Sequence, residues 1–188
     1  VIGIAIGVMV LIAVMSVMNG FERELRERIL GMAPHIMAFS PFGQLEQWQS
    51  VKQQVEQHPK ISAAAPLINT QGMLQYNGVN RYAGVLGVLP DLEAKVSIVD
   101  EHMVAGQLTD LVPGKFGVVL GSALARNLGA YVGDRVTLVV VDGVSASPAG
   151  ILPRMKRFTV VGIFEVRAEM DANLAMIHMQ DAAKLTRA

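Results

Sequence analysis

An apolar segment without a single charge opens the sequence, and it constrains the fold more than any other feature. It covers residues 1–18, where Ser16 is the only polar side chain. As an α-helix rising ~1.5 Å per residue it would extend roughly 27 Å, close to the ~30 Å hydrocarbon core of a bilayer. A secretory signal would carry a basic start and a small-residue cleavage site, and neither is visible. We therefore predict a membrane-spanning helix, with a buried core helix as the alternative.

The same helix is predicted to continue into water. The following stretch, FERELRERILGM, is rich in helix formers, and Glu22 stands four residues before Arg26, the favourable order for a helical ion pair. Gly31 and Pro34 then stop the helix. We expect residues 1–30 to form a truncated first transmembrane helix with an extension, and residues 31–188 to form a second unit. Because the apolar run begins at residue 1 without an initiator methionine, we expect the chain to be a piece of a longer protein.

Apolar side chains form a stripe that crosses the predicted membrane boundary. Val14, Met18, Phe21 and Leu25 recur at intervals of three and four, with Val17 beside them. Such a stripe can pack against the protein's own next helix or domain. It can also line an apolar groove that opens at the membrane surface, where a flexible thioether such as that of Met18 suits lipid.

The remainder of the chain mixes strands and helices without a regular βαβ rhythm, which favours an α+β fold. Asn77-Gly78 predicts a β-hairpin, and a short helix is expected with Ser122 as its N-cap and Gly129 as its end. Strands are predicted in HIMAFS, ISAAAPLIN, FGVVLG, DRVTLVVV, KRFTVVGIFEV and LAMIHM, and helices in QLEQWQSVKQQVEQH and QDAAKLTRA.

A long connection, DGVSASPAGILPRMKR, separates two of these strands. Its two prolines stiffen it and disfavour pairing as an inner strand, so we predict a protruding hook-like loop over residues 143–155. A stiff loop with apolar residues loses little entropy on docking, as a partner-binding element should. An ordinary hairpin excursion packed on its own domain is the alternative.

Several kinds of chemistry find no support in the sequence. The chain has no cysteine, and its 16 basic and 16 acidic residues give no argument for nucleic-acid binding. Phosphate-binding loops and nucleophile-elbow motifs are also lacking. The histidines lack metal-ligand spacing, so we expect no metal site and no catalytic residue; they are His35, His58, His102 and His178.

Most of the chain resembles the LolC/LolE family, the permeases of the bacterial lipoprotein-releasing ABC transporter. The segments that carry this resemblance are MSVMNGFERELRERILGMAPH, SAAAPLIN, PGKFGVVLGSALARNLGAYVGDRVTL, and a P-x-G-x-x-P pattern followed by F-x-V-x-G. The resemblance implies an inner-membrane permease subunit whose MacB-like domain lies in the periplasm. It also implies two partner subunits, a second permease (LolE- or LolC-like) and a LolD-like ATPase that binds ATP and Mg. The cargo would be outer-membrane lipoproteins, taken from the surrounding membrane lipid and passed to the periplasmic chaperone LolA. No cofactor is expected in this chain.

The resemblance also implies roles for particular residues. Lipid or lipoprotein would contact Val14, Val17, Met18, Phe21 and Leu25. The hook segment that would bind the chaperone comprises Ser147, Pro148, Ala149, Gly150, Ile151, Leu152 and Pro153. A docking pad beside it would include Arg154, Met155 and Lys156, although Met155 stands where the family has a polar residue.

Two other functions remain open on the sequence alone. A related permease of the macrolide-exporter or FtsX-like type would relay force without a lipoprotein substrate. A membrane-anchored periplasmic enzyme is the other alternative. The hook favours a LolC- or LolF-like branch, whereas SAAAPLIN is closer to LolE.

Overall fold

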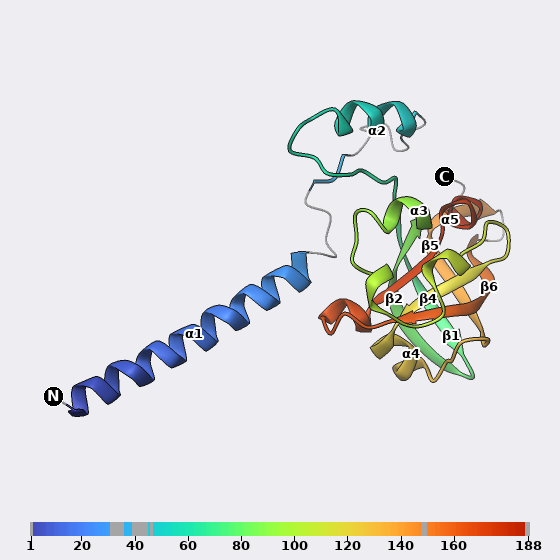
Figure 1. Cartoon of the computed structure of the whole chain (residues 1–188). Helices are drawn as coiled ribbons and strands as arrows, with labels where there is room; N and C mark the ends of the chain where they lie inside the picture. Colours follow the sequence, from blue (N-terminus) through green and yellow to red (C-terminus); the bar gives the residue numbers. More distant parts are fainter. Residues whose placement is uncertain (1, 31–35, 39–44, 46, 148–149, 187–188) are drawn as a thin grey trace.

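The computed structural model of the chain describes residues 2–30, 36–38, 45, 47–147 and 150–186, with the backbone alone for 23–30 and 141–153. The first element is the long helix α1, Ile2–Leu30, which stands apart from the folded remainder (Figure 1). Its part from Ile2 to Glu22 is long and apolar enough to cross a membrane. The predicted uninterrupted helix is therefore confirmed.

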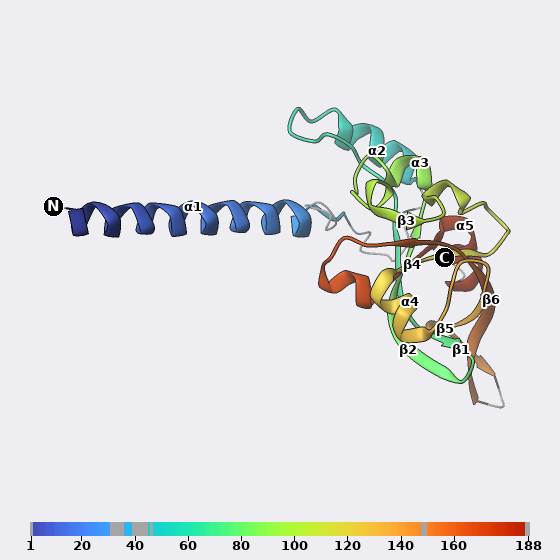
Figure 2. The ribbon, with the colours of Figure 1, turned by 60° about the horizontal axis from the view of Figure 1, so that its bottom comes forward.

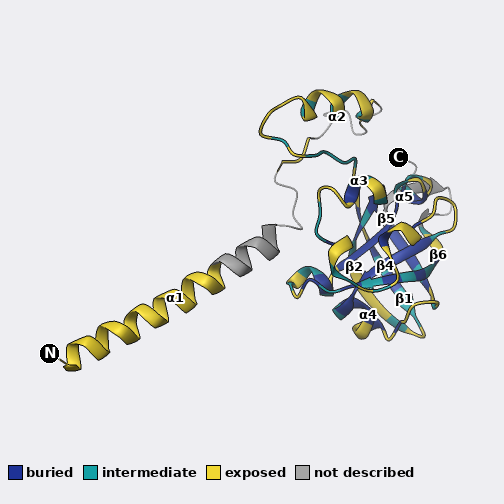
Figure 3. Ribbon diagram, viewed as in Figure 1, coloured by how far each residue is buried: buried dark blue, intermediate teal, exposed yellow. Residues whose placement is uncertain are grey.

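No side chain of α1 from residue 2 to residue 22 is buried by the rest of the described chain (Figure 3). The alternative of a core helix thus receives no support. A second helix, α2 (Trp48–Glu56), is shorter than the segment predicted for it and buries none of its residues.

A seven-stranded sheet forms the centre of the remaining chain. Its strands are β1 (Ile68–Tyr76), β2 (Val79–Val88), β3 (Met103–Ala105), β4 (Gly117–Gly121), β5 (Arg135–Ser147), β6 (Gly150–Phe164) and β7 (Leu174–His178). The order is β3-β6-β4-β7-β2-β1-β5, and β5 also pairs with β6. The strands β6, β4, β7, β2, β1 and β5 therefore form a closed ring (Figures 1 and 2). Strand β3 pairs with the end of β6, at Ile163 and Phe164, beyond the part of β6 that pairs with β5. Two pairs, β2–β7 and β4–β6, are parallel, and the other pairs are antiparallel. This mixed sheet confirms the predicted α+β class.

The predicted hairpin at Asn77-Gly78 is confirmed. Strands β1 and β2 are antiparallel, with Tyr76 opposite Val79. Asn77 and Gly78 both have positive φ, 46° and 81°, the backbone that a two-residue hairpin turn of the I′ type requires.

Two predicted strands are not found among the described residues. Residues 36–38 of HIMAFS are not in a strand, and β1 begins only at Ile68, near the end of ISAAAPLIN. Both stretches precede the ring and have no neighbouring strand with which to form hydrogen bonds, which apolar composition alone does not reveal.

Short helices connect the strands. They are α3 (Pro90–Glu93), α4 (Ser122–Leu128) and α5 (Met179–Thr186), with 3₁₀ turns at Asp100–His102, Leu108–Asp110 and Glu169–Ala172. Gly129 ends α4 in the left-handed region (φ 74°), as predicted. The prediction that Ser122 caps this helix is wrong, because Gly121 is the N-cap and the Ser122 hydroxyl lies 3.4 Å from Glu165 Oε1 instead.

Apolar side chains fill both faces of the central strands. One core cluster includes Val118, Leu120 and Phe158, with α4 and α5 packed against it. A second includes Val119 and Phe164. Strands β4 and β7 are buried at every position, which explains why their short sequences are apolar except for His178 at the end of β7.

The segment predicted as a protruding hook-like loop, residues 143–155, belongs to β5 and β6 except at positions 148–149, which lie outside the described residues. Close to the ring, Val140 faces Arg154; beyond a register shift, Ser145 faces Leu152 and Ser147 faces Gly150. Pro153 lies at that shift, where a missing backbone N–H is tolerated. The strands therefore resume beyond the shift, so the described part of the hook-like segment is the distal part of a β-hairpin. Pro148 lies outside the described residues.

Candidate functional site

Four of the five predicted lipid-contacting residues lie together on one side of α1. Val14, Val17, Met18 and Phe21, with Ala13, line one shallow apolar hollow along the helix. Their exposed fractions lie between 57% for Val14 and 74% for Val17, so none is covered by the described chain. The side chain of Leu25 lies outside the described part.

The helical period explains why these residues meet. At ~100° per residue, positions 14, 18 and 21 fall within a narrow sector, whereas Met9 and Ile12 fall on the opposite side. Met9 and Ile12 are also exposed and apolar. The membrane-embedded part of α1 is therefore apolar all round, and the predicted face differs in continuing through Phe21 toward the charged extension.

The hook segment occupies the distal end of the β5–β6 hairpin. Strand β5 pairs with β1 only over residues 137–140, and β6 pairs with β4 only from Thr159 onward. Beyond those limits, on the side away from the ring, the described backbones of β5 and β6 pair only with each other. Pro148 and Ala149 lie outside the described residues, and Ser147, Gly150, Ile151, Leu152 and Pro153 are described by their backbone.

Arg154 of the predicted pad is engaged within the chain. Its Nη1 donates a hydrogen bond to the carbonyl oxygen of Leu185 (3.0 Å), in the last turn of α5, and the side chain is half-buried. A cation at a helix C-terminus stabilises the unsatisfied carbonyls there. Arg154 therefore holds α5 against the base of the hairpin.

Lys156 is engaged as well. Its ammonium lies 4.2 Å from the centroid of the Phe116 ring, within the range of a cation–π contact. Phe116 in turn packs edge-on against the core residue Phe158, with centroids 5.6 Å apart. Met155 is 64% exposed and Lys156 is exposed as well, so these two predicted pad residues present their side chains to solvent.

Asp181, which is fully buried, fixes the loop that carries Phe116. Its carboxylate accepts hydrogen bonds from the backbone N–H groups of Gly114 (3.0 Å) and Phe116 (3.2 Å), and Lys184 lies 3.4 Å away. These bonds support the positive φ of Phe116 (52°), a conformation that a bulky residue rarely adopts. The group is a structural anchor beneath Lys156.

The described histidines serve local backbone contacts. His58 Nδ1 accepts from the N–H of Lys60, His178 Nδ1 accepts from the N–H of Gln180, and His102 Nδ1 lies 2.9 Å from the carbonyl oxygen of Ile98. Burial lowers the pKa of His178 below its ordinary value. Among the residues that the structure describes, no three His, Asp or Glu side chains gather as a metal site would require.

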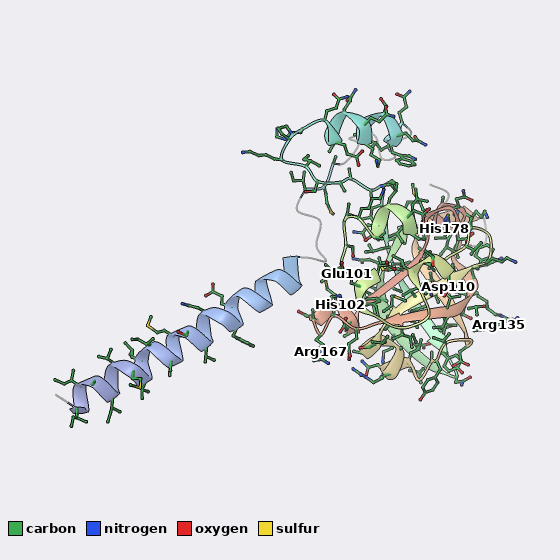
Figure 4. All side chains as sticks on the ribbon, in the orientation of Figure 1. Glu101, His102, Asp110, Arg135, Arg167 and His178 are labelled. Atoms are coloured by element: carbon green, nitrogen blue, oxygen red, sulfur yellow. The ribbon has the colours of Figure 1, made fainter. Side chains whose placement is uncertain are left out.

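A second hollow, which the sequence did not indicate, lies on the outer face of the sheet beside the Asn77-Gly78 turn. It is lined by Gln75, Tyr76, Asn77, Gly78, Asn80, Arg135, Thr137 and Arg157. They come from three separate stretches of the sequence, 75–80, 135–137 and residue 157, which strand register brings together. Figure 4 shows Arg135 extending outward from the edge of the domain.

Comparisons with known proteins agree with this architecture. Residues 1–187 match the family described as MacB-like periplasmic core domain. The chain is 42% identical over 190 residues to the lipoprotein-releasing system transmembrane protein LolC of Neisseria meningitidis, a match that covers 98% of this chain and 45% of the relative. It is 38% identical over 188 residues to LolC of Xylella fastidiosa, covering 100% of this chain and 45% of that protein. It is 31% identical over 185 residues to LolE of Haemophilus influenzae, covering 96% and 44%.

Among solved structures, the periplasmic region of MacB from Actinobacillus actinomycetemcomitans matches with a TM-score of 0.50 and 12% identity, covering 82% of this chain and 61% of that one. At that identity the likeness supports the fold alone. The chain spans slightly less than half the length of the curated LolC relatives. The predicted resemblance to LolC and LolE is confirmed, and the chain belongs to the family of MacB-like periplasmic core domains.

Proposed function

We propose that this chain is the first transmembrane helix and periplasmic domain of a permease subunit that extracts lipoproteins from the bacterial inner membrane and passes them to the chaperone LolA. The observation that carries the proposal is the exposed apolar face formed by Val14, Val17, Met18 and Phe21, in a chain whose curated relatives are named for lipoprotein release. The activity of the whole transporter is proposed from the similarity of this chain to part of those relatives.

The apolar face matches the energetic problem of extraction. Removing an acyl chain from a bilayer costs about 0.8 kcal/mol per CH₂, so a chain of ~16 carbons requires on the order of 12 kcal/mol. A continuous apolar surface from the bilayer to the membrane boundary lets the acyl chain remain covered as it leaves. Phe21 directly precedes Glu22, so the apolar surface continues to the point where the charged extension begins.

The motive step in this proposal is conformational. A LolD-like ATPase hydrolyses ATP with Mg, and a second permease subunit brings its own first helix against α1. Closing of the two helices then displaces lipid from the shared groove. This chain performs no covalent chemistry in that cycle.

The distal β5–β6 hairpin is the proposed docking element for LolA. Its described backbone is braced at the base by Arg154 and then pairs only with itself, so it can reach a partner without disturbing the ring. A preformed hairpin loses less entropy on binding than a flexible loop would.

Site-specific crosslinking in the complete reconstituted transporter tests this function. Photo-crosslinkers at Met18 or Phe21 should capture a triacylated lipoprotein, whereas the same groups at Met9 or Ile12, on the opposite side of α1, should capture mainly phospholipid. Adding ATP and LolA before irradiation should lower the yield of the Met18 adduct, and Leu152→Asp in the hook segment should prevent that decrease.

Equal capture on both sides of α1 would contradict the lipoprotein groove and favour a permease that relays force alone. Release that is indifferent to Leu152→Asp would contradict the docking role of the hairpin.

A further inference from the structure

The hollow beside the Asn77-Gly78 turn is built from a row of polar side chains that crosses four strands. Asn80 of β2 lies opposite Gln75 of β1, Gln75 lies opposite Thr137 of β5, and Thr137 lies opposite Arg157 of β6. Their neighbours Leu74 and Leu138 are fully buried, so the row lies on the outer face of the ring. Register therefore sets a continuous polar surface where the strands converge.

Arg135 adds a second guanidinium to this row. It faces Thr159, the residue two positions beyond Arg157, so the two arginines are diagonal neighbours on one face, at a typical Cα separation of about 7–8 Å. Both are exposed. Neither guanidinium forms a hydrogen bond or ion pair with another residue in the described part of the chain.

The lining contains hydrogen-bond donors and two positive charges but no acid. Asp134 lies at the margin and is already engaged, because one of its oxygens accepts the N–H of Tyr131 (2.8 Å). A hydrogen bond from the Tyr76 hydroxyl to Asp134 also raises the pKa of Tyr76. The surface thus offers donors and charge that are satisfied by an anion with several acceptor oxygens.

We infer that this hollow binds carboxylate groups presented by an acidic protein partner. An arginine guanidinium matches a carboxylate with two parallel hydrogen bonds, and the amides of Asn80 and Gln75 can donate to the same group. Tyr131, 74% exposed at the margin, supplies the aromatic surface that is enriched in protein interfaces. The volume of the hollow, about 440 Å³, lies within the range of ligand pockets.

Two observations favour a protein over a membrane surface. Recognition of anionic lipid uses clusters of roughly four to eight basic residues, and this hollow presents two arginines. The hollow also lies at the far end of β1 from Ile68, the residue at which the chain enters the ring after α1 and α2. At ~3.3 Å per residue, the strand separates the two points by roughly 26 Å.

The inference does not depend on lipoprotein release, and its test is independent of that activity. The full chain in nanodiscs of zwitterionic lipid is titrated into a fluorescent peptide of six glutamates, and binding is followed by anisotropy. We expect binding that weakens with added salt. Arg135→Gln and Arg157→Gln should each weaken it roughly fivefold, the effect of losing one exposed ion pair.

Arg81→Gln is the matched control. Arg81 belongs to the same hairpin but alternates to the other face from Asn80, and it donates a hydrogen bond to the carbonyl of that neighbour. Its loss should leave the peptide affinity nearly unchanged, because its side chain alternates to the face opposite the one that carries the polar row. Circular dichroism of all three variants confirms that they remain folded.

Three results would overturn the inference. The first is an equal loss in Arg81→Gln and the two pocket variants. The second is displacement of the peptide by inorganic phosphate at a similar concentration, which would assign the hollow to phosphate. The third is arginine-dependent binding to phosphatidylglycerol vesicles in the absence of peptide binding, which would assign it to the bilayer.

Discussion

Helix α1 and the strand ring are both rich in apolar side chains, yet they have opposite fates. The ring buries its own, including Phe158, Leu120 and Phe164 at about 1% exposure or less, while α1 buries none between residues 2 and 22. Each square ångström of apolar surface left in water costs roughly 25 cal/mol. The apolar composition of a segment therefore indicates how much of its surface must be removed from water. The way the strands connect and pair decides whether the chain itself can bury that surface. The ring is self-sufficient, and α1 needs surroundings of another kind.

The largest expected effect comes from truncating one phenylalanine in each region. Phe158→Ala should lower the free energy of unfolding of the ring by about 3–5 kcal/mol, because it leaves a cavity between Phe116 and the strands. Phe21→Ala should leave it unchanged. Urea unfolding of the full chain in detergent micelles, followed by circular dichroism, measures both.

A loss of similar size in Phe21→Ala would break the comparison. It would show that α1 contributes to the stability of the ring, and that its exposure in isolation does not describe its role.

Two glycines offer a smaller contrast of the same kind. A Cβ on Gly121 would lie 2.3 Å from the backbone oxygen of Asp171, whereas a Cβ on Gly20 of α1 would meet nothing within 4 Å. Gly121→Ala should destabilise the ring by about 1–3 kcal/mol, since backbone must move to admit the methyl group. Gly20→Ala should instead favour the helix by roughly 1 kcal/mol and leave ring unfolding unaffected.

Thermal unfolding of the ring and hydrogen exchange along α1 distinguish these outcomes. If Gly121→Ala were neutral, the tight contact between β4 and the Glu169–Ala172 turn would be more compliant than the structure indicates.

The smallest effect sharpens the comparison by asking what burial does to a charge in the domain. Burial raises the pKa of Glu93 above its ordinary 4.5, and a hydrogen bond with Ser97 partly opposes this. The folded state thus binds the proton more tightly than the unfolded state. The favourable contribution is complete below the unfolded pKa and is lost as pH rises through the folded pKa.

Glu93→Gln removes this titration. The variant should therefore gain stability relative to the native chain as the pH rises from below 4.5 toward neutrality. Urea midpoints across that range measure the difference. A constant difference at all pH values would show that the carboxyl group is effectively solvated.

Much of the fold could be predicted from short-range patterns. The charge-free run predicts α1, Asn77-Gly78 predicts the β1–β2 turn, and Gly129 predicts the end of α4, because each depends on a few adjacent residues. Ring closure could not be predicted this way. It requires β6 to pair with both β5 and β4, and β2 to pair with β7, and such contacts leave no periodic trace in the sequence.

The candidate sites divide along the same line. The stripe through Val14, Met18 and Phe21 follows from the helical period and was found without a structure. Arg135 and Arg157 were not connected, since their meeting depends on the register of β5 against β6. Arg154 and Lys156 were expected to face a partner, and the structure shows them engaged by Leu185 and Phe116, contacts that no local pattern reveals.

We expect the register shift between Val140 and Ser145 to separate a part of the hairpin that tolerates few replacements from a part that tolerates more. Residues on the ring side are held by pairing with neighbouring strands and by the core, so most replacements there are eliminated. Described residues beyond the shift pair only with the other strand of the hairpin, so fewer contacts restrict their replacement. The distal part of the hairpin can therefore change in sequence and length without loss of the ring. A segment from a related protein, grafted at this boundary, should transfer the binding specificity of that segment.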